Sequence, residues 1–182
     1  MNKKSILTTD NLSIGYKTKK ETIIIAEQLN LNLDAGKLIT LVGANGIGKS
    51  TLLRTLTGIQ KPLSGNVFLN QKNINSFDGI TLAQELSLVL TEKLPPSNLT
   101  IFELISLGRQ PYTNWLGKLS EDDLEKVNSV MKLTQTEHLA EKKHFEISDG
   151  QLQKIMIARA LAQETSIIIL DEPTTHLDLF HK

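Results

Sequence analysis

The sequence predicts an α/β fold with a central sheet of mostly parallel strands. Two stretches support this prediction. In residues 38–58, LITLVGANGIGKSTLLRTLTG, an apolar run without helical periodicity leads through a glycine-rich loop into a helix-compatible segment. In residues 150–173, a helical pattern leads into the apolar run IIIL and ends in Asp-Glu-Pro. Strands that alternate with helices are typical of parallel sheets, because each helix supplies the crossover between two strands.

The composition is that of an ordinary globular domain. The 182 residues are enough for one domain with its own core. Lys plus Arg and Asp plus Glu number 20 each, so the neutral chain gives no electrostatic reason to expect a nucleic acid partner. Cysteine is absent, which excludes disulfides and thiolate metal sites in this chain. No apolar run approaches the ~20 residues of a membrane span or forms the core of a secretion signal. We therefore expect a soluble, cytoplasmic protein.

The first part of the chain is expected to be rich in strands. Residues 5–15 alternate loosely and end in a Gly-Tyr pair, which predicts a strand followed by a turn. Residues 22–33 alternate apolar and polar side chains, as in strand pairs with one solvated face. A turn at residues 34–37 leads into residues 38–42, which we expect to form a buried central strand.

A helix follows the glycine-rich loop. It is expected over residues 49–57, with Gly58 placed just beyond its end, where glycine accepts a left-handed conformation. After a turn at residues 61–65, short strands are expected over residues 66–69 and 86–90.

The middle of the chain, residues 95–147, is expected to be a helical insert. Residues 99–107 have helical spacing, with Thr100 as the N-cap and Glu103 as its capping-box partner. A second amphipathic helix is expected to begin at Ser120, because an acid-rich first turn follows it. The expected apolar stripe of this second helix consists of Val127, Val130, Met131 and Leu133.

The glycine-rich loop has the pattern of a phosphate site. GANGIGKS fits the template G-x-x-x-x-G-K-[ST]. Its glycines permit the positive φ angles that turn backbone N–H groups toward an anion, and the following helix points its positive end at the same place. Lys49 would add a positive charge at the terminal phosphates, and the Ser50 hydroxyl would be a Mg²⁺ ligand. The residues expected to bind nucleotide phosphates are Gly43, Asn45, Gly46, Gly48, Lys49, Ser50 and Thr51. An ordinary glycine-rich turn is the alternative.

Two acids follow the last predicted strand. A third helix is expected over residues 150–163, and it leads into a strand over residues 166–170. Ligands of open parallel sheets lie beyond the carboxyl ends of the strands, so Asp171 could reach Mg²⁺ from a neighbouring strand. Glu172 would then orient and deprotonate a water for attack on the terminal phosphate. The alternative is a strand that simply ends in two acids before Pro173.

The start of the third helix offers a second anion site. Ser148, Gly150 and Gln151 combine a hydroxyl with free N–H groups at a positive helix end. From the residues alone, the better interpretation is that Ser148 is an ordinary N-cap.

Four motifs together resemble the nucleotide-binding domain of ATP-binding cassette (ABC) transporters. They are GANGIGKST, ISDGQLQKIMIARALAQ, IIILDEP and TTHLD, in this order, and the resemblance covers essentially the whole chain. It implies a P-loop NTPase fold of ABC type, with a mostly parallel central sheet, an antiparallel β subdomain and a helical subdomain insert. It also implies ATP and Mg²⁺ as ligands, with ATP hydrolysis.

The resemblance also assigns roles to individual residues. Tyr16 would stack on adenine. Ser148, Gly150 and Gln151 would form the signature motif that closes on the γ-phosphate of ATP bound to a second subunit, which the resemblance implies is a copy of this chain. Asp178 would belong to the D-loop at the same dimer interface.

A narrower resemblance concerns the transported substrate. The stretch VLTEKLPPSNLTIFELISLGRQPYTNWLG is similar to importers for iron–siderophore complexes, haem and cobalamin. It implies that the chain docks on a membrane permease at the cytoplasmic face of the membrane, and that the permease receives substrate from an extracytoplasmic binding protein. The implied organisation is one ATP-binding domain, with residues 1–94 and 165–182 as the α/β core and residues 95–150, approximately, as the helical subdomain.

The chain departs from the family pattern in three places. Asp149 stands where the signature usually has glycine, and its carboxylate is expected to point to solvent, because its charge near ATP would cost binding. Thr91 and Glu92 stand where the Q-loop normally has Gln, and either could substitute for it. The third departure concerns the switch-loop His, which the family has on a strand some way beyond the D-loop. The chain stops at Lys182, and His176 and His181 are too near the D-loop to take that role. The expectation is a truncated domain that binds MgATP and hydrolyses it poorly.

Two other functions are compatible with these motifs. One is an ABC ATPase without a permease, acting on ribosomes or nucleic acid, although such proteins usually carry paired cassettes or long charged insertions. The other is a truncated cassette that binds nucleotide without turnover.

Overall fold

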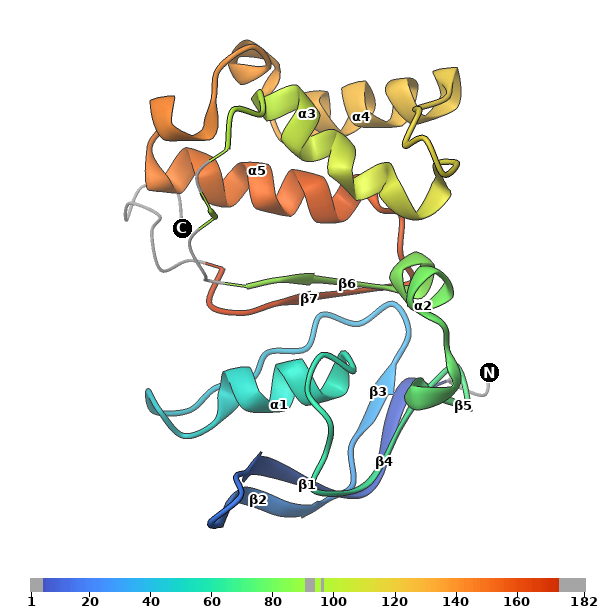
Figure 1. The fold of residues 1–182 in the computed structure, drawn as a ribbon, viewed down its shortest axis with the longest axis vertical. Helices are drawn as coiled ribbons and strands as arrows, with labels where there is room; N and C mark the ends of the chain where they lie inside the picture. Colours follow the sequence, from blue (N-terminus) through green and yellow to red (C-terminus); the bar gives the residue numbers. More distant parts are fainter. Residues whose placement is uncertain (1–4, 91–93, 96, 174–182) are drawn as a thin grey trace. The chain divides into compact units, whose positions relative to one another are not determined.

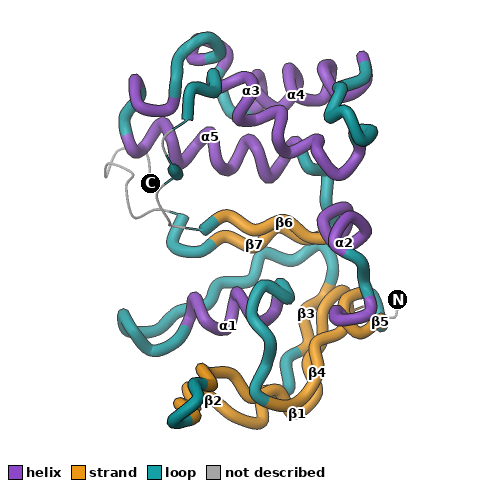
Figure 2. The backbone as a smooth tube through the Cα atoms, in the orientation of Figure 1, coloured by secondary structure: helices purple, strands orange, loops and turns teal. Residues whose placement is uncertain are grey.

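The computed structural model describes residues 5–90, 94–95 and 97–173. The chain divides into two compact units, residues 1–82 and residues 83–182, and each is described by itself. Figures 1 and 2 show the elements of both units along the chain.

The first unit is built on an antiparallel sheet around one long strand. β1 (Ser5–Lys17) pairs with β2 (Thr22–Leu29), β3 (Asn32–Asp34) and β4 (Ser64–Leu69), and β4 pairs in turn with β5 (Lys72–Asn73). These pairings confirm the strands expected within residues 5–15, 22–33 and 66–69, although the first strand continues to Lys17, through the turn predicted after Gly15. The sequence analysis missed β5, which is two residues long.

The core of this unit includes side chains from two paired strands of the sheet. Leu7, Leu12 and Ile14 of β1 are buried, together with Val67 and Leu69 of β4. Alternate residues of a strand share a face, and register shifts along β1 interrupt its pairing with β2 and with β4. The sheet therefore buries apolar side chains from both β1 and β4.

The helix expected after the loop is present as α1 (Lys49–Leu56). Gly48 precedes it in a left-handed conformation, and Gly58 follows it with φ +76°. The N–H of Gly58 donates to the carbonyl of Thr55, 3.1 Å away, which satisfies one carbonyl of the last turn. The predicted role of Gly58 at the helix end is confirmed.

The buried strand expected at residues 38–42 is wrong. These residues form no strand in the structure, and Leu38 and Val42 are 98% and 85% exposed. A strand needs a neighbour that pairs with its backbone groups. In the described part of the first unit, the ladder partners of β1 are β2, β3 and β4, and no ladder includes residues 38–42. The apolar composition indicated a strand, but composition does not supply the partner.

The second unit contains a parallel strand pair. β6 (Leu86–Val89) and β7 (Ile167–Leu170) lie side by side in register, from Leu86 opposite Ile167 to Val89 opposite Leu170 (Figure 1). Both strands were predicted. α2 (Gly79–Glu85) leads directly into β6 and was not predicted. Among the described residues, this pair is the parallel part of the expected central sheet.

Three helices form the other layer of the second unit. They are α3 (Ile101–Ser106), α4 (Glu121–Leu133) and α5 (Asp149–Ala162). Thr100 and Glu103 form the predicted capping box of α3, and Ser120 caps α4 with Asp123 as its partner. Short 3₁₀ segments join the elements of the chain: Ile74–Ser76, Leu107–Tyr112, Glu137–Leu139 and His144–Glu146.

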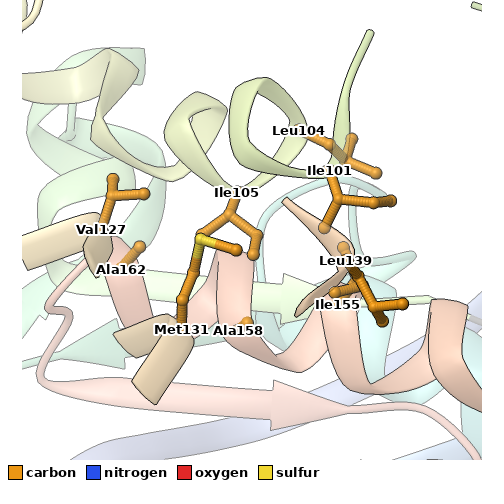
Figure 3. Packing of buried hydrophobic residues seen from close by; sticks show 9 residues of the cluster. All are labelled: Ile101, Leu104, Ile105, Val127, Met131, Leu139, Ile155, Ala158 and Ala162. Atoms are coloured by element: carbon orange, nitrogen blue, oxygen red, sulfur yellow. The ribbon is translucent and has the colours of Figure 1, made fainter. Parts of the chain in front are cut away.

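The three helices pack around one apolar core (Figure 3). Ile105 of α3 and Met131 of α4 meet over Ala158 of α5, which has too small a side chain to hold them apart. The other buried members of this core are Ile101, Leu104, Val127, Leu139, Ile155 and Ala162. Val127 and Met131 follow the predicted stripe of α4, whereas Leu133 is exposed, so the stripe was predicted one residue too long.

Within the described ranges, no helix has the length and apolar character needed to cross a bilayer.

Candidate functional site

The loop before α1 adopts the backbone expected for an anion site. Gly46 and Gly48 have φ angles of +77° and +107°, which residues with a Cβ rarely adopt. At Gly48 there is a second reason for glycine, because a Cβ there would lie 2.2 Å from Cγ2 of Ile25 on β2. The loop therefore depends on glycine at position 48 both for its conformation and for its contact with the sheet.

Lys49 lies over this loop. Its Nζ donates hydrogen bonds to the carbonyls of Gly43 and Ala44, at 2.9 and 3.0 Å. Both acceptors are neutral, so a phosphate group would offer the ammonium a stronger, charge-assisted partner. The long side chain lies over the loop, and its ammonium has no carboxylate partner in the part of the chain that the structure describes.

The first turn of α1 completes the cradle. Gly48, the N-cap residue, has no side chain to cap the helix, and the first turn contains no acidic residue. The leading N–H groups of a helix lack intrahelical acceptors and carry its positive dipole end. Ser50 is half-buried in this turn and Thr51 is buried. The arrangement presents backbone donors, one ammonium and two hydroxyl groups at one place.

Tyr16 belongs to the same part of the molecule. Its hydroxyl lies 2.8 Å from Oγ1 of Thr51, and 47% of the residue is exposed. The carbonyl of Gly15, just before it, accepts a hydrogen bond from Nε2 of Gln60 at 2.6 Å. The sequence analysis missed both contacts, because they join residues 35 and 45 positions apart and no local pattern marks them.

The two acids lie in the second unit, directly after β7. Asp171 is 3% exposed, and its backbone N–H donates to the carbonyl of Val89 at 2.9 Å, which extends the strand pair by one residue. Glu172 is exposed and has a positive φ of +46°. Both acids therefore lie at the carboxyl end of a parallel strand pair, as the sequence predicts.

The start of α5 is capped reciprocally. Oγ of Ser148 accepts from the N–H of Gln151 at 3.3 Å, and Oε1 of Gln151 accepts from the N–H of Ser148 at 3.0 Å. The N-cap interpretation of Ser148 is confirmed. Gly150 is half-buried, and Asp149 is exposed, as expected for a carboxylate that points to solvent.

The predicted site residues are thus described in two groups. The phosphate-loop residues and Tyr16 belong to the first unit, and Asp171, Glu172 and the start of α5 belong to the second. Several predicted positions lie outside the described residues: Thr91, Glu92, His176, Asp178 and His181.

The fold and the loop geometry define an α/β protein of the P-loop NTPase class. A family model described as ABC transporter matches residues 26–175. The chain belongs to the ABC transporter family, as the four motifs predicted.

Similar proteins point the same way. An uncharacterized ABC transporter ATP-binding protein of Methanocaldococcus jannaschii is 45% identical over 97% of this chain and 60% of its own length. The iron(3+)-hydroxamate import ATP-binding protein of Bacillus subtilis is 39% identical over 97% of this chain and 64% of its own length. Among solved structures, a dimeric ATP-binding cassette bound to ADP and Pi in a post-hydrolysis state superposes with a TM-score of 0.82, at 28% identity, covering 96% of this chain and 77% of that one. The chain thus spans less than two thirds of the length of both curated relatives.

Proposed function

We propose that this chain binds ATP with Mg²⁺ and hydrolyses it as a subunit of an importer. The observation that carries the proposal is the loop of residues 43–48, with two glycines at positive φ and the Lys49 ammonium held over its carbonyls. This backbone fits a chain of phosphates, because positive φ angles allow N–H groups to turn toward an anion and no carboxylate of the described residues pairs with the lysine.

The residues of the loop and of α1 would bind the phosphates. Backbone N–H groups of the loop and the first turn of α1 would hold the β- and γ-phosphates, with Lys49 adding charge stabilisation as negative charge shifts during transfer. The Ser50 hydroxyl and the Asp171 carboxylate are oxygen donors of the kind that Mg²⁺ prefers. When bound, Mg²⁺ supplies charge neutralisation between phosphate oxygens.

Glu172 is proposed as the residue that prepares the attacking water. It would accept a proton from that water while the carboxylate holds the oxygen in line with the γ-phosphate. Its exposed position after β7 leaves the carboxylate in reach of solvent. Catalysis in this scheme comes mainly from positioning and charge stabilisation.

A second copy of the chain is proposed to complete the site. Oγ of Ser148 accepts a hydrogen bond from Gln151 and keeps its own proton, so it can still donate to a phosphate oxygen of ATP bound to the partner subunit. Gly150 would allow close backbone approach to that phosphate. The dimeric state of a similar cassette with ADP and Pi supports this arrangement.

The proposed transport role rests on relatives. One similar protein is an import ATP-binding protein for iron(3+)-hydroxamate, which supports an iron chelate or a related metal-containing nutrient as the substrate. We propose that the chain acts at the cytoplasmic face of a membrane, docked on a permease that an extracytoplasmic binding protein supplies. We also retain one ATP-binding domain, with residues 1–94 and 165–182 as core and about 95–150 as helical subdomain.

Nucleotide binding is tested by replacing the loop lysine. Lys49→Ala should abolish MgATP binding measured by calorimetry, because no other side-chain cation contacts the loop carbonyls in the described residues. Lys61→Ala is the matched control, because Lys61 is exposed in the turn after α1. Unchanged ATP affinity in Lys49→Ala would contradict the proposed function.

Hydrolysis and dimer closure are tested at Glu172. Glu172→Gln should bind MgATP, release no phosphate and accumulate as a dimer in light scattering, since the bound nucleotide is not consumed. Glu125→Gln, an exposed change on α4, should behave as wild type. Normal turnover in Glu172→Gln would refute its role as the base.

The permease is tested by affinity purification from membranes solubilised in detergent. Recovery of an integral membrane protein of the importer type would support the transport role. Ribosomal material without any membrane protein would instead favour the ABC ATPase that acts without a permease.

A further inference from the structure

We propose that Thr51 is a positioning residue for Tyr16, so that the helix after the phosphate loop also sets the ring on which, as the family resemblance implies, the nucleotide base would stack. The inference rests on the proposed binding of ATP at the loop of residues 43–48. It adds a role for Thr51 beyond phosphate binding. Through this residue, the position of the base-binding ring is coupled to the helix that follows the phosphate loop.

The contact that carries this proposal is short and partly shielded. The hydroxyl of Tyr16 lies 2.8 Å from Oγ1 of Thr51, and either oxygen can be the donor. Thr51 is 5% exposed and belongs to α1, where its carbonyl accepts a hydrogen bond from Oγ1 of Thr55 at 2.8 Å. One partner of the pair is therefore fixed inside a helix, and the other lies near the end of β1.

Tyr16 is held at both ends. Its backbone belongs to β1 and pairs with Ile23 of β2, and the preceding carbonyl accepts from Nε2 of Gln60. Its hydroxyl is held by Thr51 at the far end of the ring. A phenol ring fixed at its Cα and at its oxygen can still turn about its long axis, but it cannot swing to another rotamer.

The exposure of the Tyr16 ring suggests that its hydrogen bond to Thr51 preorders the ring for a ligand. About half of Tyr16 remains exposed although its hydroxyl is engaged, so the ring is not simply packed into the core. Free aromatic side chains lose rotamer freedom when a ligand binds them, which lowers affinity about 2- to 10-fold per side chain. Because Thr51 restricts Tyr16 before ligand arrives, stacking would avoid most of this loss.

The test compares ATP with inorganic tripolyphosphate, which has the phosphates and lacks the base. Tyr16→Phe removes only the hydroxyl and keeps the ring. It should weaken ATP binding by about 2- to 10-fold, as estimated for a side chain that is no longer preordered. Its affinity for tripolyphosphate should not change, because tripolyphosphate has no base to stack on the ring.

Thr51→Val and Thr51→Ser separate positioning from phosphate binding. The readout is the ratio of ATP affinity to tripolyphosphate affinity, in which any direct phosphate contact of Thr51 cancels. Thr51→Val should lower this ratio as much as Tyr16→Phe does, and the double variant should lower it no further. Thr51→Ser keeps the hydroxyl and should restore the wild-type ratio.

Ring mobility supplies a readout independent of affinity. The chain has two tyrosines, Tyr16 and Tyr112, so fluorotyrosine labelling gives one signal to follow and one internal reference. A ring released from Thr51 should move faster, and faster motion narrows its fluorine NMR line. Without nucleotide, Thr51→Val should therefore narrow the NMR line of Tyr16 and leave that of Tyr112 unchanged.

The outcomes are distinguishable. Wild-type ATP affinity in Tyr16→Phe, or additive losses in the double variant, would overturn the positioning role while the proposed function stands. A wild-type chain that binds neither ATP nor tripolyphosphate would overturn the proposed function, and the role of Thr51 with it.

Discussion

Single backbone positions decide whether the phosphate loop can form. Gly46→Ala and Gly48→Ala both place a Cβ at positive φ, yet only the second also pushes it against Ile25, since nothing lies within 4 Å of a Cβ at position 46. We expect Gly46→Ala to lower the free energy of unfolding by about 1–2 kcal/mol. Gly48→Ala should lower it by about 2–5 kcal/mol, because overpacking adds to the backbone strain.

Urea denaturation of the two variants measures this difference, and MgATP titration measures its effect on the loop. Gly48→Ala should lose more affinity than Gly46→Ala. Equal effects of the two substitutions would show that Ile25 yields without cost.

A second residue-scale prediction concerns Asp123, which is buried beside Arg109. Hydrogen bonds from Ser120, followed by the interaction with Arg109, lower the pKa of Asp123 from its ordinary 3.8 to about 2. A folded-state pKa below the unfolded value means that the carboxylate contributes its full stability above pH about 4 and loses it as the pH falls toward 2. The gap in melting temperature between wild type and Asp123→Asn should therefore be widest above pH 4 and shrink below it.

Glu125→Gln serves as the control for this pH series, because Glu125 is exposed on the same helix. Its melting temperature should follow that of the wild type throughout. A gap between wild type and Asp123→Asn that stays constant from pH 5 to pH 2 would contradict the lowered pKa.

At the scale of elements, one buried arginine joins three segments of the second unit. Arg109, in the 3₁₀ segment Leu107–Tyr112, is 2% exposed. Its Nε donates to Asp123 of α4 at 2.8 Å, and its Nη1 donates to the carbonyl of Ala162, at the end of α5, at 2.8 Å. The same Nη1 lies 2.9 Å from the carboxylate of Glu164. The end of α5 is thereby fixed to α4 just before the chain enters β7.

Removing this arginine should leave a buried carboxylate without its partner. We expect Arg109→Met to lower the free energy of unfolding by about 3–5 kcal/mol, the usual result of breaking a buried ion pair from one side. The double variant Arg109→Met with Asp123→Asn should recover part of that loss in urea denaturation, since no uncompensated charge remains. A double variant that is less stable than Arg109→Met would contradict this explanation.

The elements that the sequence predicted well are those whose signals are local. The capping box at Thr100 uses residues three positions apart, the helix start at Ser120 is marked by the acidic turn that follows it, and the phosphate loop is a motif of eight residues, so each can be read from one window. Strand pairing is different, because the partner lies elsewhere in the chain. The strand expected at residues 38–42 failed for that reason, and the contact of Tyr16 with Thr51 left no trace in either local pattern.

At the scale of the whole molecule, the described motifs that assign the chain to its family form the local structures expected of them. GANGIGKST forms a loop and helix in the first unit, and IIILDEP forms a strand with acids after it in the second. The sequence order of these motifs carried the prediction of ATP binding. The order of the motifs could not predict which strands of the described chain pair with one another.

The last prediction concerns residues 38–42, which are apolar and yet belong to no described strand pair. Leu38 and Val42 are almost fully exposed, and no strand ladder of the described residues includes this stretch. In hydrogen exchange measured by mass spectrometry, amides of residues 38–42 should exchange at rates near those of an unfolded peptide. Those of Ile167–Leu170, which pair with β6, should be protected in the same sample. Equal protection of the two segments would show that residues 38–42 do find a partner strand in solution, as their composition predicts.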